Sequence, residues 1–462
     1  MTDPGSDRQI QSLIAWAVQN GASIHPSIQV HRTAATGLSL FVLPTAPTGP
    51  SPSEAILRVP TPLTLSYLDA LSDGSFPAPL LAGAPPHLVG RLFLIRQFLL
   101  GTASFWWPYI QALPQPDDVD AWSLPPFWPP HEAELLDGTN VEVGAESIRC
   151  HVKRELSLAR ALLKDCRDYV AVSLAEALRT PTLYHWAYCI FSSRSFRPSL
   201  VLSARQDDLL AQHGASLDDF SLLFPLFDIA NHDMTATVQW RRHEPSQACE
   251  LLVDKFFPPG SQVFNNYSFK TNAELLLGYG FMLPVTDELH NDYAHVRKRD
   301  SPDEYLISLR PLAHPSSLLV RARQQRLEPD DDDVLGAFRH VQPDMVWDMF
   351  CALAPADSHQ RLLPTPGRTG DDAERHRRRS FLTGSVTGEC RLYLEQTVAL
   401  IQHKVLQELE RLDETDVEVA GGDANLLSRN QRLALDYRAR CRQVLEKTLE
   451  AIRLDEPADD SE

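Results

Sequence analysis

An Asn-His pair, a single tyrosine and two further aromatic residues follow one another in one stretch of this chain. They are Asn231-His232, Tyr267, Tyr279 and Phe281. An asparagine amide offers two N–H donors and one acceptor, and a phenol can both donate and accept a hydrogen bond. Such a set suits a narrow pocket that holds a cationic cofactor and a long side chain at the same time.

The elements that must position these residues can be predicted from polar-apolar spacing and from Gly and Pro positions. In the first part of the chain we expect a hairpin turning at Gly37 and a Pro-rich ordered loop over 113–130. We expect helices over 12–19, 88–100, 145–177, 183–196 and 273–278, and strands within 28–43, 55–60, 237–252 and 263–267. Beyond Pro284 we expect an extended segment over 293–309, helices over 317–326, 334–354, 389–412 and 426–452, solvated loops over 328–333 and 364–379, and a frayed tail after Leu454.

The ordered blocks resemble a SET domain, and the match is closest to the branch typified by Rubisco large-subunit lysine methyltransferase. The blocks are Gly37–Phe41, Ser192–Phe196 after Trp186, Asp228–His232, Tyr267 and Asn272–Phe281. The resemblance implies an α+β fold, in which a SET-domain β-fold with a pseudoknot and a helical insertion is followed by an all-helical C-terminal domain. It implies an N-terminal SET part over 1–75, the insertion over 76–182, the C-terminal SET part with the catalytic pocket over 183–285, and a helical substrate-binding domain over 286–462.

The same resemblance implies roles for individual residues. Tyr267 would be the catalytic residue that orients the reacting groups. The chain departs from the family pattern at Ser39, where a second glycine is usual. S-adenosyl-L-methionine would be bound by Thr36, Leu38, Ser193, Arg194, Asn231, His232, Tyr267 and Phe281, and the substrate by Arg194, Phe196, Asp228 and Tyr279.

The implied activity is S-adenosylmethionine-dependent methylation of a protein lysine. The amine must be uncharged to react, although free lysine has a pKa of about 10.4, and the neighbouring sulfonium charge would lower that pKa. Phe196 favours lysine over histidine, because the branch that methylates an actin histidine carries asparagine at this place. Two alternatives remain open: a catalytically idle SET-fold protein that binds a partner, and a protein-histidine methyltransferase.

Composition narrows the partners. The net charge is −18, from 61 acidic and 43 basic residues, which argues against a nucleic-acid binder and suits a basic ribosomal, translation or histone protein as the partner.

The seven widely spaced cysteines fit reduced thiols and give no zinc-finger spacing. His185, His232 and His243 are not spaced as a metal set, so we expect no metal. No signal peptide or membrane span is visible, and we expect a monomer in the cytoplasm, the nucleus or both.

Overall fold

The computed structural model describes residues 4–33, 36–203, 206–243, 246–286, 290–298, 301, 303–314, 316–319, 333–386, 388–417 and 426–454. The chain divides into two compact units. The first unit contains Met1–Phe127, Ser147–Ser268 and Gly278–Gly280, and the second contains Trp128–Glu146, Phe269–Leu277 and Phe281–Glu462. The four-part division expected from the sequence stays a prediction.

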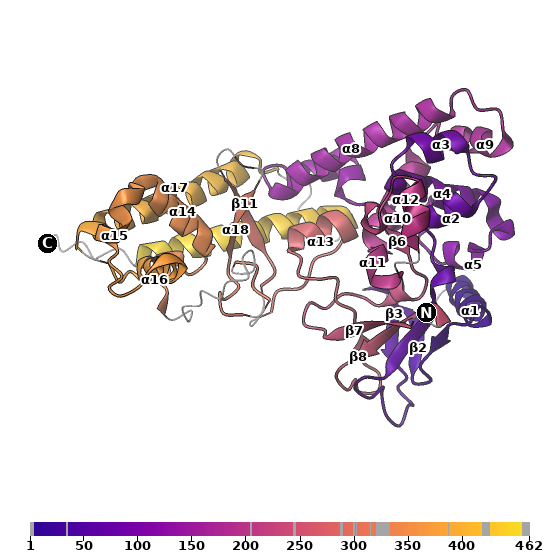
Figure 1. Ribbon diagram of the computed structural model, residues 1–462, viewed down its shortest axis with the longest axis horizontal. Coiled ribbons are helices and arrows are strands. Elements are labelled where there is room, and N and C mark those ends of the chain that lie inside the picture. The colour runs from indigo at the N-terminus through magenta and orange to yellow at the C-terminus, as the bar shows by residue number, and fades with distance from the viewer. Residues whose placement is uncertain are drawn as a thin grey trace. The chain divides into compact units, whose positions relative to one another are not determined.

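The first unit contains small antiparallel sheets (Figure 1). One has the strand order β2-β3-β9 and another the order β1-β4-β8-β7. The turn between β2 and β3 ends at Gly37, whose φ of 68° is open to glycine without strain, so the expected hairpin is confirmed. The strands are β1 (Ser23–Ile24), β2 (Ile28–Thr33), β3 (Gly37–Val42), β4 (Ala55–Pro60), β5 (Ser195–Phe196), β6 (Leu222–Leu223), β7 (Val238–His243), β8 (Ala248–Val253) and β9 (Gln262–Val263).

Helices pack beside these sheets in the same unit. The helix expected over 145–177 is in fact two helices, because α8 ends at Leu163 and α9 begins after Asp168, whose side chain accepts a hydrogen bond from the Ala171 N–H. The expected loop over 113–130 contains short helical turns. The helices of this unit are α1 (Pro4–Gln19), α2 (Tyr67–Ser72), α3 (Ala78–Gly83), α4 (Pro86–Leu100), α5 (Trp107–Ile110), α6 (Val119–Trp122), α9 (Tyr169–Ala177), α10 (Thr182–Arg194), α11 (Pro198–Val201), α12 (Asp207–Gln212) and most of α8 (Asn140–Leu163).

The second unit is mainly helical, with one hairpin of β10 (Tyr293–Arg297) and β11 (Glu304–Ser308). That hairpin confirms the extended segment expected over 293–309. Most of the segment expected as a helix over 317–326, most of the acidic loop over 328–333 and the tail after Leu454 lie outside the described residues. The helices are α7 (Pro130–Ala133), α13 (Asn272–Tyr279), α14 (Pro343–Leu353), α15 (His359–Leu362), α16 (Gly370–Leu382), α17 (Gly388–Glu414) and α18 (Arg429–Leu454).

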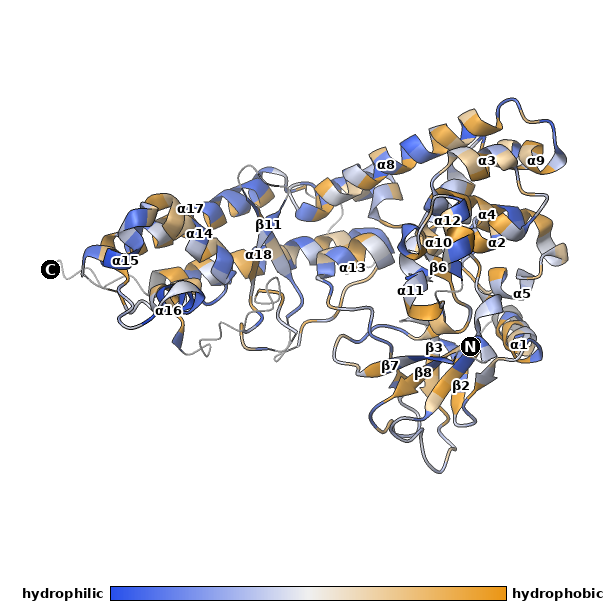
Figure 2. Cartoon of the chain, in the orientation of Figure 1, coloured by the Kyte–Doolittle hydropathy of each residue, from blue (hydrophilic) through white to orange (hydrophobic). Residues whose placement is uncertain are grey.

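Two expectations for this unit were wrong. The helix expected from residue 334 starts only at Pro343, because proline fixes a helical φ and lacks the N–H that an interior position needs. The loop expected over 364–379 contains most of α16, which Figure 2 colours largely hydrophilic. The basic run misled the prediction: Arg378 is buried and forms an ion pair with Asp344, and Phe381 supplies the apolar contact.

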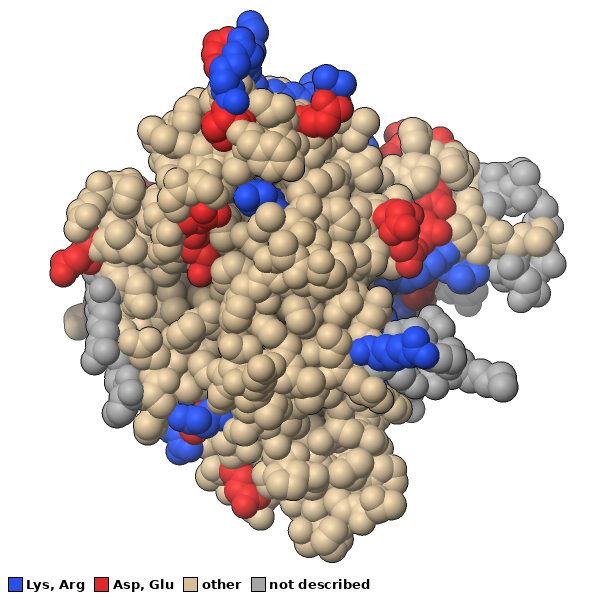
Figure 3. Space-filling model, turned by 90° about the vertical axis from the view of Figure 1, so that its right-hand side faces the viewer, with Lys and Arg blue, Asp and Glu red and all other residues tan. Residues whose placement is uncertain are grey.

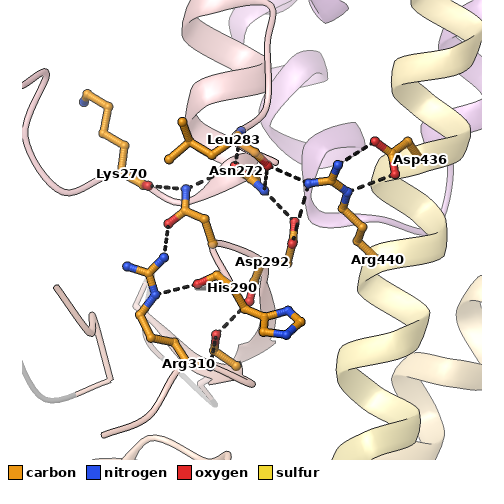
Figure 4. Close-up of polar contacts among 10 residues, drawn as sticks. Lys270, Asn272, Leu283, His290, Asp292, Arg310, Asp436 and Arg440 are labelled. Carbon is orange, nitrogen blue, oxygen red and sulfur yellow. Dashed lines mark hydrogen bonds and ion pairs between the residues drawn. The ribbon is translucent and has the colours of Figure 1, made fainter. Parts of the chain in front are cut away.

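A buried polar network joins several segments of the second unit (Figure 4). The Asn272 amide donates to the Asp292 carboxylate at 2.7 Å and accepts from the Leu283 N–H at 2.9 Å. Arg440 on α18 donates to the Leu283 carbonyl at 2.7 Å. Because unpaired buried polar groups are costly, this network specifies how the N-terminal end of α13 packs.

Among the described residues, no helix combines the length and the apolar character that crossing a membrane requires. None of the seven cysteines forms a disulfide bond.

The buried Glu155 gives the first unit an acid-sensitive contact. Arg91 donates to both Glu155 oxygens, at 2.8 and 2.6 Å, and the Tyr184 hydroxyl donates at 2.8 Å. Burial alone would raise the Glu155 pKa, but His87, Arg91 and Tyr184 together lower it from 4.5 to about 2. A depressed carboxyl pKa stabilises the fold above the unfolded value, and this contribution is lost as the pH falls from about 4.5 toward 2.

We therefore expect Glu155→Gln to lower the free energy of unfolding by about 3 kcal/mol at pH 7. The difference in the free energy of unfolding between the variant and the unchanged protein should shrink as the pH approaches 3. Below pH 4.5 the unfolded carboxyl group takes up a proton, and the stability that the ionised Glu155 contributes to the fold is progressively lost. Urea unfolding followed by tryptophan fluorescence measures both values. The exposed Glu446→Gln on α18 is the control, and a Glu155→Gln effect equal to that of the control would contradict the expectation.

Candidate functional site

The Asn231-His232 segment lies beside the residues that precede Tyr267. His232 and Asn265 form an isolated parallel bridge. The Asn265 N–H donates to the Asn231 carbonyl at 2.7 Å, and the Tyr267 N–H donates to His232 Nδ1 at 3.1 Å. The strand expected over 263–267 was wrong, because β9 ends at Val263 and the following backbone pairs with the Asn-His segment instead. Tyr267 therefore stands on a loop held by long-range contacts.

The Tyr267 phenol is enclosed by aromatic rings and a backbone carbonyl. Its hydroxyl donates to the Ala230 carbonyl at 3.0 Å. Its ring stacks on His232 at 5.0 Å between centroids and on Tyr279 at 5.1 Å. Burial raises the pKa of the phenol above its usual value, with Tyr279 and Asp228 adding to the rise and Arg194 opposing it. The hydroxyl is thus a neutral, fixed donor rather than a base.

The Asn231 side chain contacts the β2–β3 hairpin, 193 positions earlier in the sequence. Its Nδ2 donates to the Leu38 carbonyl at 3.3 Å and to Ser39 Oγ at 2.8 Å. The Ser39 hydroxyl is fully buried and also pairs with the Thr36 hydroxyl at 2.8 Å. The residue that departs from the family pattern therefore joins the predicted loop residues Thr36 and Leu38 to Asn231. With Nδ2 donating to Leu38 and Ser39, the side-chain oxygen Oδ1 of Asn231 is the group left for other partners.

Arg194 and Asp228 are brought together as predicted. Arg194 Nη1 lies 3.5 Å from Asp228 Oδ2 and donates to the Asp228 carbonyl at 3.4 Å. Sequence reasoning missed Tyr109, whose hydroxyl donates to the same Oδ2 at 2.9 Å. Burial raises the pKa of Asp228, and Arg194 and Tyr109 oppose that rise. The signal that could have found Tyr109 is the aromatic run Phe105–Tyr109, which ends in the hydroxyl that a buried carboxylate needs.

We expect Tyr109→Phe to lower the free energy of unfolding by about 1–3 kcal/mol, because Asp228 would lose a buried hydrogen bond. Calorimetric thermal unfolding measures the change. Tyr169→Phe is a matched control, since the Tyr169 side chain is exposed on α9. Equal midpoints for the two variants would show that the contact contributes nothing.

The remaining predicted residues differ in where they lie. The Ser193 hydroxyl donates to the Cys189 carbonyl within α10, at 2.8 Å, so its side chain is used inside the helix. Phe196 on β5 packs against Trp240 at 5.0 Å, and Trp240 in turn contacts Phe227 at 4.9 Å. These rings form an apolar wall. Phe281 belongs to the second compact unit, so its contact with the cofactor stays a prediction.

Two non-glycine residues near the site have left-handed backbone. Leu226 has a φ of 72° and lies just before the turn that contains Asp228, and Ser268 has a φ of 79° directly after Tyr267. Such a conformation costs of order 1–2 kcal/mol for a residue with a Cβ. The surrounding contacts hold both residues in place.

The chain is similar in sequence to curated protein-lysine N-methyltransferases. The chain is 28% identical over 306 residues to protein-lysine N-methyltransferase EFM1 of Saccharomyces cerevisiae, covering 59% of this chain and 49% of that protein. It is 26% identical over 281 residues to ribosomal lysine N-methyltransferase set10 of Schizosaccharomyces pombe, covering 60% of this chain and 46% of that protein. The chain thus spans about half the length of these curated relatives.

The fold is that of a solved SET domain. The structure of the Rubisco methyltransferase LSMT SET domain bound to lysine and AdoHcy superposes with a TM-score of 0.58 at 18% identity, covering 98% of this chain and 92% of that one. The predicted fold class, a SET domain with a helical C-terminal part, is confirmed. No family model matches the sequence.

Proposed function

We propose that this chain, a relative of the SET-domain protein-lysine methyltransferases with the fold of Rubisco LSMT, is an S-adenosylmethionine-dependent protein-lysine N-methyltransferase. The observation that carries the proposal is the assembly around Tyr267. Its hydroxyl is fixed on the Ala230 carbonyl, its ring lies against His232 and Tyr279, and Asn231 is the next residue after Ala230.

The residues present fit this cofactor. S-adenosylmethionine supplies a methyl group on a positively charged sulfur, and an uncharged amine takes that methyl in an in-line displacement. The ring of Tyr279 can attract a cation through its π face. The side-chain oxygen Oδ1 of Asn231, which is not used by the two contacts of Nδ2 to β3, can accept from the cofactor's ammonium group. Arg194 can pair with its carboxylate.

The site does its work by position rather than by covalent chemistry. Tyr267 stays neutral because burial raises its pKa, so its oxygen can hold the amine and the methyl group in line without taking the proton. Positioning of this kind can lower the activation free energy by several kcal/mol. Well-oriented reactants can gain roughly 7–11 kcal/mol in this way. The proton that the amine nitrogen must lose passes to water rather than to Tyr267.

Lysine is the side chain that the apolar wall favours. Phe196 and Trp240 offer ring faces to the methylene stem of lysine, and the Trp240 N–H is already directed at the Asn265 side chain, at 3.4 Å. An imidazole would find no hydrogen-bond acceptor on Phe196. Histidine methylation is therefore the second candidate, and mass spectrometry of the methylated peptide distinguishes the two.

The substrate we propose is a basic protein of the translation apparatus or a histone, met by a monomeric enzyme in the cytoplasm or nucleus. Two relatives are named as ribosomal lysine methyltransferases, and the net charge of −18 suits a basic partner. On the face shown in Figure 3 the charged side chains of both signs form small separate groups. Among the residues that the structure describes, that face shows no single acidic patch, and we expect the substrate lysine to be selected mainly by the pocket.

The test is labelling of a cell extract that lacks the endogenous enzyme, with the purified chain and methyl-labelled S-adenosylmethionine, followed by peptide mapping. We expect label on lysine of one or a few proteins. Calorimetry with S-adenosylmethionine distinguishes the proposed enzyme from a catalytically idle SET-fold protein. A folded chain that binds no cofactor would overturn the proposal. Sedimentation and microscopy of a tagged chain test the monomer and the compartment.

A further inference from the structure

We propose that His87, His151 and Glu155 of the first unit form a binding site for a divalent transition metal, with zinc as the best fit. One ligand atom from each residue lies within 4.8 Å of the others. Glu155 Oε1 is 2.7 Å from His87 Nε2 and 3.0 Å from His151 Nε2. The sequence prediction of no metal considered cysteine spacing and other histidines, and did not test this group.

The two helices that carry these residues explain why they meet. His151 and Glu155 are four positions apart on α8 and so share one face of the helix. His87 is in the first turn of α4, and its ring lies 6.0 Å from that of His151. Two imidazoles and one carboxylate are a ligand set that zinc takes in proteins, with a further position for water.

The two histidine–carboxylate distances are close to those of a tetrahedral site, and the two imidazole nitrogens lie within 4.8 Å of each other. Zinc–ligand bonds of about 2.0–2.2 Å place neighbouring ligand atoms about 3.3 Å apart, so both imidazoles would move outward by only about 0.3–0.6 Å. Their side chains are 33% and 51% exposed and have room to do so. His87 Nε2 is buried and, despite its short separation from Oε1, has no hydrogen-bond partner of acceptable geometry.

Glu155 Oε2, the second carboxylate oxygen, is hydrogen-bonded on the side away from the two histidines. Arg91 and Tyr184 donate to Oε2 at 2.6 and 2.8 Å, which leaves Oε1 facing the two imidazoles. Arg91 is itself fixed over the Tyr188 ring, at 4.6 Å. Such outer contacts orient a ligand carboxylate. Arg91 also lies 2.8 Å from Oε1, and its positive charge opposes the ion, so we expect a dissociation constant in the micromolar range rather than that of a tight structural site.

The function of the ion would be to join α4 to α8. None of its ligands belongs to the assembly around Tyr267, so the inference goes beyond the proposed methyl transfer and does not depend on it. An ion that binds only the folded chain raises its unfolding temperature.

The test uses the full chain after treatment with a chelator. Isothermal titration with zinc chloride is expected to show one ion per chain with a micromolar Kd, and cobalt chloride is expected to give the visible absorption of a tetrahedral centre. His151→Ala should weaken zinc binding about tenfold or more. The matched control is His403→Ala, an exposed histidine on α17, which should bind as the unchanged chain does.

His151 is exposed, so its removal should leave the fold intact, and circular dichroism checks this. His87→Ala provides a second variant with the same expected loss. Binding below one ion per chain, or an unchanged Kd in both histidine variants, would show that Glu155, His87, His151 and Arg91 form only a hydrogen-bonded cluster.

Discussion

Tyr267→Phe is expected to lower the rate of methyl transfer on the order of a hundredfold while cofactor binding changes by no more than about threefold. The reason is that the hydroxyl is fixed on the Ala230 carbonyl, where its oxygen can orient the groups that react, whereas the ring contacts with His232 and Tyr279 survive the substitution. Turnover with labelled S-adenosylmethionine and calorimetric Kd values measure the two effects separately.

The control for this substitution is Tyr169→Phe, which removes a hydroxyl from an exposed ring at the start of α9. It should leave both quantities unchanged. If Tyr267→Phe kept turnover within about twofold of the unchanged chain, the proposed orienting role would be wrong even if the protein proved to be a methyltransferase.

Asn231→Ala is expected to weaken cofactor binding by about 2–3 kcal/mol, or roughly 30- to 150-fold in Kd. The substitution removes the amide that joins the Asn-His segment to Leu38 and Ser39, together with the acceptor proposed for the cofactor's ammonium group. Because both losses weaken cofactor binding, the Kd is measured by calorimetry with S-adenosylmethionine.

Ser39→Ala tests how the amide is oriented without removing it. It should weaken cofactor binding about fivefold, the effect of one neutral hydrogen bond. Asn20→Ala is the control, because the Asn20 amide donates to the Trp16 carbonyl at the end of α1. Thermal unfolding of each variant separates lost binding from lost folding, and a folded Asn231→Ala chain with an unchanged Kd would contradict the assignment.

Local features of the fold were well predicted from the sequence. The hairpin at Gly37 and the end of α13 at Gly280 both depend on glycines with positive φ, of 68° and 74°, and such positions are readable from residue type. Arg194 and Asp228 were both predicted as site residues through the family resemblance, and the structure places their side chains 3.5 Å apart.

Features that depend on distant partners were missed. Tyr109 is 119 residues from Asp228 along the chain. The aromatic run around Tyr109 marks it as a residue that could be buried, but it does not show which carboxylate the hydroxyl will meet. The segment before Tyr267 reads as a strand, but it pairs with the Asn-His segment rather than continuing β9. Arg378 reads as a solvated charge, yet Asp344 neutralises it, 34 positions away, and α16 forms around the buried pair.

The positive φ of Ser268 has an evolutionary consequence. A sequence selected only for stability would place glycine directly after Tyr267, since glycine accepts that backbone without strain. Glycine would also widen the range of conformations open to the loop, and the phenol would then be less narrowly aimed. Serine at position 268 therefore accepts some backbone strain and, in return, restricts the conformations of the loop that carries the Tyr267 phenol.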